Sequence, residues 1–243
     1  MELQTVDSTN NYALTQIHAG LAEHAMAIFS HEQVAGKGQR GKIWSSSKQE
    51  NIALSIILKP APLPVSRQFQ LSACAAVSVA EWFSHYAGDD TRIKWPNDLY
   101  WKDRKAGGIL IESIIRNREN ETGNWEWAVT GIGININQVS FPDELLNPVS
   151  LKQITGKSFE PVHLARELCQ TFEHHYHELL TVGFHTILSA YNARLYKKSE
   201  KVKLKKDNRV FETMIKEVTP EGKLVVQHMI EEQFDHGDIQ WII

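Results

Sequence analysis

The chain has 243 residues, of which 42% are hydrophobic and 23% are charged, and its formal net charge is −3. This composition is ordinary for a globular protein with room for one substantial domain and a small one, and it gives no general attraction to nucleic acid. The two cysteines lie far apart, which indicates thiols in a reducing compartment. No signal peptide and no apolar run of about 18 residues is visible. We therefore expect a cytoplasmic protein without membrane or nucleic-acid partners.

The first half of the chain predicts alternating helices and strands around a glycine-rich loop. Ser8 or Thr9 can cap a helix that ends near Gly20. Two strands are predicted, at residues 25–30 before the loop and 52–58 after it. Prolines then break the chain, and a helix with one apolar face is predicted for residues 66–86.

The second half predicts strands, then helices, then strands again. The predicted strands cover residues 92–95, 99–101, 109–115 and 125–136, with turns at 102–104 and 118–124. Helices are predicted at 162–181 and 184–196. Residues 201–243 alternate like β structure. We expect a main domain of residues 1–197 and a small β-barrel-like domain of residues 198–243.

The loop at residues 36–44, Gly-Lys-Gly-Gln-Arg-Gly-Lys-Ile-Trp, is the most informative segment. Its glycines let the backbone approach a ligand closely, and Lys37, Arg40 and Lys42 place positive charge beside them, which suits a phosphate or an acid being joined to one. A dinucleotide-binding loop or a P-loop would need a helix next, whereas a strand follows. A plain turn with solvated cations explains the loop equally well in isolation.

The segment Gly131-Ile132-Gly133-Ile134-Asn135 alternates with period two. A strand would place the isoleucines on a core face and the glycines and Asn135 on the other face, as a flat floor for a planar ligand. A strand packed closely under a helix is the alternative.

Three further segments carry candidate polar groups. In residues 94–98, Lys94 could meet a phosphate, and Asn97 or Asp98 could help to hold magnesium; a simple turn is the alternative. Lys105 precedes a glycine pair and suits an anionic or carbonyl oxygen, although hairpin lysines are common. Residues 7–11 hold more hydrogen-bonding groups than helix capping requires.

Together these segments occur in the order and spacing found in biotin protein ligases, which the chain resembles along essentially its whole length. The motifs that carry the resemblance are residues 7–10, Gln33, and the segments 36–41, 94–98, 105–108 and 131–135. The chain begins directly at the catalytic region, so we expect the monofunctional type without a DNA-binding repressor module. Many members carry arginine where this chain has Lys37 and Gln39, so a bidentate fork and one charge are lost.

The resemblance implies an α+β fold: a catalytic domain with a mixed sheet, related to class II aminoacyl-tRNA synthetases, and a C-terminal SH3-like barrel. It implies that biotin and MgATP give biotinyl-5′-AMP, which then acylates one lysine of a biotin carboxyl carrier domain. Catalytic roles are expected for Lys105, Arg40 and Lys37. The protein would act as a monomer or a homodimer.

The resemblance also implies two binding sets. The expected biotin-binding residues are Ser8, Thr9, Asn10, Gln33, Lys37, Gly38, Gln39, Trp44, Lys105 and Gly107. The expected ATP-binding residues are Arg40, Lys42, Lys94, Asn97 and Asn135, with Asp98 as a ligand of Mg²⁺. Trp44 and its loop would close over the adenylate and exclude water.

Two alternatives remain open: a lipoate or octanoate ligase or transferase of the same fold, and a non-catalytic biotin-binding module. Two other features favour ordinary explanations. His174, His175 and His177 could be ligands of a metal, but adjacent side chains on a helix point in different directions, so a solvated helix face is the preferred interpretation. The lysine-rich stretch 197–206 indicates a strand with a wet face.

Overall fold

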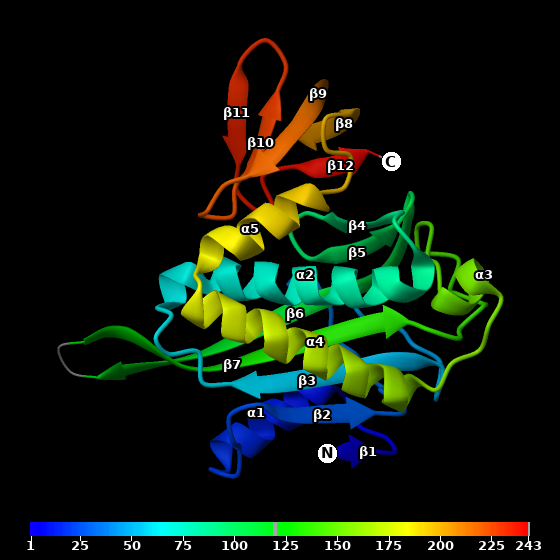
Figure 1. Cartoon of the computed structure of the whole chain (residues 1–243), viewed down its shortest axis with the longest axis vertical. Coiled ribbons are helices and arrows are strands. Elements are labelled where there is room, and N and C mark those ends of the chain that lie inside the picture. Colours follow the sequence, from blue (N-terminus) through cyan, green and yellow to red (C-terminus); the bar gives the residue numbers. More distant parts are fainter. Residues whose placement is uncertain (119–120, 243) are drawn as a thin grey trace.

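The computed structural model describes the whole chain except residues 119, 120 and 243 (Figure 1). Its first sheet is mixed, with the strand order β1-β2-β3-β7-β6-β5-β4, and its second sheet is antiparallel, with the order β11-β10-β9-β8-β12. Among the described residues, β1 and β2 pair in parallel, whereas the other neighbouring strands of this sheet pair antiparallel. The expected α+β class, with a mixed main sheet and a smaller C-terminal β unit, is confirmed.

The elements alternate along the chain much as the sequence predicts. The first sheet contains β1 (Glu2–Leu3), β2 (Met26–Ser30), β3 (Asn51–Leu58), β4 (Thr91–Lys94), β5 (Asp98–Trp101), β6 (Arg104–Arg118) and β7 (Glu121–Asn135). The helices are α1 (Thr9–His18), α2 (Gln68–Ala87), α3 (Leu151–Thr155), α4 (Pro161–Thr181) and α5 (Phe184–Ala193). The second sheet contains β8 (Lys201–Lys206), β9 (Arg209–Val218), β10 (Leu224–Gln227), β11 (Glu231–Phe234) and β12 (Gln240–Ile242).

The two faces of the first sheet are covered differently. Helices α2 and α4 lie across one face, and α1 lies against the other, near β2 and β3 (Figure 1). Along β7, Ile132 and Ile134 are buried in the large core with α2, whereas Val129 belongs to a separate cluster with Ala13 of α1. The prediction that the isoleucines of residues 131–136 face the core is therefore confirmed. We call the side toward α1 the glycine face.

Helix α2 supplies much of the large core. Trp82 and Phe83 are almost fully buried, which stabilises the fold by roughly 1.5–3 kcal/mol for each such side chain. The helix ends where Gly88 adopts a positive φ of 79° and its N–H caps the last turn. The face of the sheet toward α2 is therefore filled by core side chains.

The second sheet packs against the first unit through specific contacts. Trp95 Nε1 donates a hydrogen bond to the carbonyl oxygen of Gly222 at 2.9 Å, and the ring of Phe69 lies where a side chain on Gly222 would be. Leu204 and Phe234 of the second sheet belong to the same buried cluster as α2. The two units therefore share one continuous core.

Three local features differ from the sequence-based expectations. The turn predicted at 118–124 is wrong in part, because β6 runs to Arg118 and β7 begins at Glu121; residues 119 and 120 lie outside the described part. Ladder pairing outweighs the turn-forming composition there. Helix α3 was not predicted, although Ser150 and Gln153 form a complete capping box before and within it. Strand β1 was also not predicted, being only two residues long.

Two further expectations concern surfaces. In β8, Leu204 is buried while Lys201 and Lys203 are exposed, which confirms a strand with one wet face. Within the described residues, none of the helices combines the length and the apolar character needed to cross a lipid bilayer.

Candidate active site

The floor of the candidate site is formed by Gly131 and Gly133 on the glycine face of β7. A side chain on Gly131 would collide with the amide group of Asn10, and one on Gly133 would lie 2.5–2.8 Å from the indole atoms of Trp44. Glycine is therefore required at both places by close approach. At Gly131 the strand packs closely under α1, which is the alternative that the sequence left open, and at Gly133 the indole of Trp44 lies on the strand.

Polar groups from α1 line one end of this floor. The side-chain oxygen of Gln33 accepts hydrogen bonds from the backbone N–H of Thr9 at 2.8 Å and from its hydroxyl at 3.1 Å. Ser55 Oγ of β3 lies 2.7 Å from Thr9 Oγ1 and 2.6 Å from Asn10 Oδ1. Thr9, Asn10 and Ser55 are all buried, so their directions are set by this network.

The same network reaches the glycine-rich loop through one carboxylate. Asn10 Nδ2 donates to Glu112 Oε2 at 2.7 Å, and Lys37 Nζ lies 3.5 Å from Glu112 Oε1. Lys37 is exposed, so this ion pair is weak and can exchange for a ligand. The expected biotin-binding residues Thr9, Asn10, Gln33 and Lys37 are thus brought together.

Ser8, Gln39 and Gly38 lie at the edges of this group. Ser8 is 2% exposed and occupies the N-cap position of α1, but its hydroxyl does not cap the helix. Gln39 begins the 3-10 turn Gln39–Gly41 and is half-buried. Gly38 N–H donates to the carbonyl oxygen of Lys42 at 2.7 Å.

The loop itself is a tight hairpin. Trp44 N–H donates to the carbonyl oxygen of Gly36 at 2.9 Å, and a side chain on Gly36 would collide with the backbone of Trp44. Arg40 at the tip has φ 55° and ψ 41°, the left-handed conformation that non-glycine residues adopt rarely. The loop is therefore shaped by its own hydrogen bonds.

Arg40 contacts the second sheet in this structure. Its Nη2 donates to the carbonyl oxygen of His236 at 2.8 Å, in the turn between β11 and β12. Its guanidinium lies where a side chain on Gly237 would be, and Gly237 has a φ of +100°. Arg40, which we expect to act in catalysis and ATP binding, is thus held by the C-terminal turn. The same turn contacts Trp95, because the rings of Trp95 and His236 pack edge to face with their centres 5.9 Å apart.

A second cluster of charge lies where β4, β5 and β6 meet. Lys105 Nζ is 2.7 Å from Asp98 Oδ1, and Asp98 is directly opposite Gly108 in the ladder. Burial lowers the pKa of Lys94 to about 8; Asp98 opposes the shift, and Lys105 and Lys42 add to it. The expected cations Lys42, Lys94 and Lys105 therefore share one electrostatic environment around Asp98.

Aromatic rings enclose Lys94. Its Nζ is 3.1 Å from the hydroxyl of Tyr100 and 4.8 Å from the centre of that ring. The ring of Trp241, from β12, lies 5.3 Å away. The second sheet thus helps to desolvate this ammonium group, which strengthens its attraction for an anion such as phosphate.

Three expected site residues are engaged in local structure. The side-chain amide of Asn97 donates to the carbonyl oxygen of Ile109, and that of Asn135 donates to the carbonyl oxygen of Val149 at 3.1 Å. Gly107 pairs with Ile134 in the ladder and so lies toward the core face, which leaves its backbone as the group that a ligand could contact. Gly108 faces Asp98 and Lys105 instead.

Several contributing residues were missed from the sequence. Ser55 and Glu112 are polar residues within otherwise apolar stretches of strand, and their period-two register could have placed them on the glycine face. His236, Gly237 and Trp241 carry no comparable local signal. Their role depends on how the second sheet packs.

Comparisons with known proteins agree with this architecture. The profile of the "Biotin/lipoate A/B protein ligase family" matches residues 2–127. The chain is 32% identical to the biotin--[acetyl-CoA-carboxylase] ligase of Paracoccus denitrificans over 82% of each chain. It is 33% identical to the bifunctional ligase/repressor BirA of Bacillus spizizenii over 74% of this chain and 55% of that protein. The chain thus spans about half the length of the bifunctional relatives that it matches.

Solved structures share the fold over the whole chain. The biotin protein ligase from Aquifex aeolicus in complex with biotin and ATP has a TM-score of 0.81 at 21% identity and covers 100% of this chain and 97% of its own. The Leishmania major biotin protein ligase in complex with biotinyl-5-AMP has a TM-score of 0.63 at 20% identity, covering 96% and 97%. From the profile match and the Paracoccus relative, the chain belongs to the biotin/lipoate A/B protein ligase family.

Proposed function

We propose that this protein is a biotin protein ligase. It joins the carboxylate of biotin to the α-phosphate of ATP, which gives biotinyl-5′-AMP and pyrophosphate, and then transfers the biotinyl group to one lysine of a biotin carboxyl carrier domain. The observation that carries the proposal is that the glycine floor under Trp44 runs directly into the Lys94–Lys105–Asp98 cluster: Gly133 pairs with Gly108, and Gly108 pairs with Asp98. An acyl group on the floor would thus meet a phosphate at the cations.

The first step brings together two anions, and the lysines offset their repulsion. As the carboxylate oxygen attacks the α-phosphorus, negative charge grows on the phosphoryl oxygens and on the departing pyrophosphate. Lys105, held beside Asp98, and the desolvated Lys94 stabilise that charge. Loss of one such group typically costs about 3–4 kcal/mol of transition-state stabilisation.

The second step transfers the acyl group. The amine of the acceptor lysine attacks the acyl carbon, the bond to phosphate oxygen breaks, and AMP leaves with the electron pair. Lys105 would stabilise the charge on the acyl oxygen. The hairpin loop of residues 36–44 would keep water from the mixed anhydride while the acceptor approaches.

The unpaired donor of Trp44 supports a ligand on the floor. Trp44 Nε1 is buried, and among the described residues nothing accepts a hydrogen bond from it. A buried donor without a partner costs about 1–3 kcal/mol, so a polar ligand placed beside it would be stabilised.

We assign the two binding sets along this line. The biotin side comprises Ser8, Thr9, Asn10, Gln33, Lys37, Gly38, Gln39, Trp44, Lys105 and the backbone of Gly107, and the nucleotide side comprises Arg40, Lys42, Lys94, Asn97 and Asn135. Asp98 would hold Mg²⁺ together with phosphate oxygens, because it is a partly exposed carboxylate of the kind that Mg²⁺ prefers. Mg²⁺ would neutralise phosphate charge.

The acceptor would be the biotin carboxyl carrier domain of a biotin-dependent carboxylase. We place the reaction in the cytoplasm, with residues 1–197 as the catalytic domain and residues 198–243 as the domain that contacts Arg40 and Lys94. The protein would work as a monomer or a homodimer, without nucleic acid.

The test is ATP–pyrophosphate exchange with Mg²⁺, in which biotin, lipoate and octanoate are compared at equal concentration. Exchange that depends on biotin alone is the expected result. Exchange with lipoate or octanoate would keep the acyl-adenylate chemistry and overturn the substrate. Biotin binding without exchange would mean a binding module.

A further inference from the structure

His175 on α4 lies between two carboxylates. Its Nδ1 is 3.3 Å from Glu178 Oε2, one turn along the same helix, and its Nε2 is 3.3 Å from Glu81 Oε2 of α2. The residue is only 6% exposed. The sequence-based expectation of a solvated histidine face is therefore wrong for His175, although His174 and His177 are exposed.

This arrangement sets a condition on the imidazole. A neutral imidazole has one N–H donor and one lone pair, and a carboxylate only accepts. If Nε2 donates to Glu81, the lone pair of Nδ1 faces an oxygen of Glu178 across 3.3 Å, which is repulsive. The contact between Nδ1 and Glu178 becomes favourable only if a second proton or a metal cation lies between these two groups.

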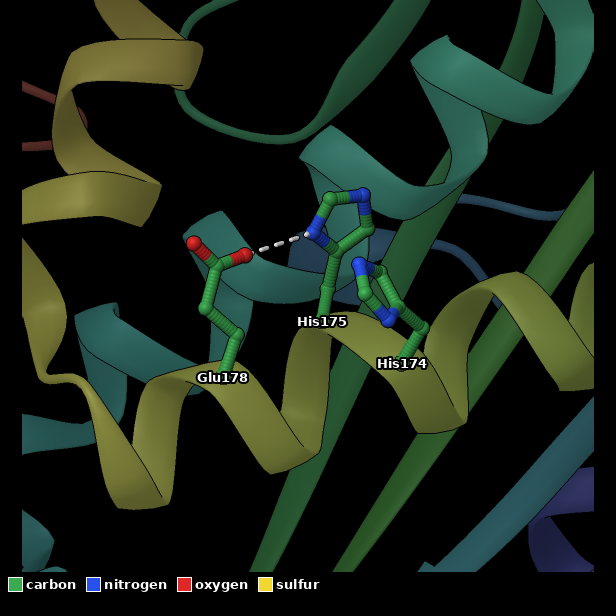
Figure 2. A group of neighbouring side chains, drawn as sticks. All are labelled: His174, His175 and Glu178. Atoms are coloured by element: carbon green, nitrogen blue, oxygen red, sulfur yellow. Dashed lines mark hydrogen bonds and ion pairs between the residues drawn. The ribbon is translucent and has the colours of Figure 1, made fainter.

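A third donor is present at the same place. His174 is the next residue along α4, and the centre of its ring is 5.3 Å from that of His175, on the other side of His175 from Glu178 (Figure 2). Each of His174, His175 and Glu178 offers one atom that can bind a metal, and these three atoms lie within 4.8 Å of one another. Tetrahedral zinc with bonds of about 2.0–2.1 Å separates its ligand atoms by about 3.4 Å. The Nδ1–Oε2 distance of 3.3 Å already matches, and the exposed His174 can close the rest by rotating.

The surroundings also fit a metal site. A metal-binding histidine usually donates its other N–H to a carboxylate, which fixes its tautomer, and Glu81 is placed to accept that bond from Nε2. Glu178 and His174 are open to solvent, so an ion can enter and keep a water as its fourth ligand. Two imidazoles with one carboxylate favour zinc over magnesium or calcium.

We propose that His174, His175 and Glu178 bind one zinc ion, with Glu81 orienting His175. The site lies on the helical layer, on the opposite face of the sheet from the glycine face, and so is separate from the proposed active site. Through Glu81 the ion would strengthen the contact between α4 and α2.

The test is Zn²⁺ titration of the full chain without affinity histidines, by calorimetry and by thermal unfolding, with Co²⁺ absorption to report on coordination. His174→Ala removes an exposed ligand without disturbing the core. His177→Ala is the matched control, since it removes an exposed histidine three residues along the same helix. We expect one ion per chain in the parent and in His177→Ala, and at least tenfold weaker binding in His174→Ala.

The contrary outcomes are equally clear. Equal binding by both variants would mean adventitious surface ions and would overturn the site. An absence of binding by the parent would also overturn the site. Thermal unfolding of metal-free His174→Ala should match that of the metal-free parent, and only the parent and His177→Ala should be stabilised by Zn²⁺.

Discussion

The indole of Trp44 lies on the backbone of Gly133, in the space that a side chain would fill. Its ring atoms come within 2.5–2.8 Å of where a Cβ would stand. One residue belongs to the glycine-rich loop and the other to the central strand of the sheet, so this contact closes the loop onto the floor. The absence of a side chain at residue 133 is therefore what allows the loop to close.

Gly133→Ala should push Trp44 off the floor. The added methyl should destabilise the protein by about 1–3 kcal/mol, as overpacking does, and weaken biotin binding. The measurement is a double-mutant cycle on the free energy of unfolding. In a Trp44→Ala background the same change should cost nothing or stabilise the strand. An equal loss of unfolding free energy in both backgrounds would show that Gly133 and Trp44 are not coupled, which would contradict this prediction.

Lys105→Ala should lower adenylate formation by about 10²–10³-fold, the effect of removing one preorganised donor from a developing anion. Single-turnover formation of the adenylate is the measurement. Lys102→Ala is the matched control, because Lys102 is exposed in the same hairpin and pairs with Asp90 at the surface. Comparable rates for the two variants would remove Lys105 from the site.

The lowered pKa of Lys94 should make ATP affinity and folding stability change in opposite directions with pH. Burial lowers its pKa from 10.5 to about 8, so the unliganded folded protein loses this charge as pH rises through 8. ATP affinity should fall by up to about tenfold per pH unit above 8. Because the unfolded chain holds the proton up to pH 10.5, stability should rise between pH 8 and 10.5.

Lys94→Arg supplies the control for this pair of effects, because arginine stays charged over that range. In this variant, ATP affinity and the free energy of unfolding should change much less with pH when both are measured from pH 7 to 10. If ATP affinity and stability still change with pH in the variant, a group other than Lys94 causes these changes.

Gly237→Ala should displace Arg40 from the C-terminal turn, because the methyl would occupy the place of the guanidinium. The loop should then loosen, so trypsin should cut after Arg40 at least tenfold faster, and the KM for ATP should rise. Gly156→Ala is the control for backbone strain, since Gly156 also has a positive φ, of +75°, but open space around it. Equal trypsin sensitivity in both variants would contradict a clamp between Arg40 and the turn.

Much of the main-sheet architecture was readable because its signals are local. The alternation in residues 131–136 predicted which face of β7 is core, and Ile132 and Ile134 are indeed buried. The turn expected at 118–124 was too long, because β6 extends to Arg118 and β7 begins at Glu121, and their pairing supplies hydrogen bonds that composition does not reveal. The short helix α3 had a readable capping box, Ser150 with Gln153, but no apolar repeat long enough to indicate a helix.

The candidate site was readable only in part. The sequence indicated Thr9, Gln33, Lys94, Lys105 and the glycines, and the structure brings them to one face of the sheet except Gly107, which lies toward the core face. The network through Ser55 and Glu112 depends on strand register, which places Ser55 opposite Gly131. The buried state of His175 depends on Glu81, which lies 94 residues away in another helix.

The sequence by itself determined the order of helices and strands, the two faces of β7 and the glycine-rich loop with its charges, because each follows from backbone preferences of neighbouring residues. Tertiary structure decided that Arg40 meets His236, 196 residues away, and that Trp241 helps to enclose Lys94. These contacts arise from the packing of the second sheet on the first unit. Burial and hydrogen bonding between distant segments depend on that packing, and no local pattern encodes it.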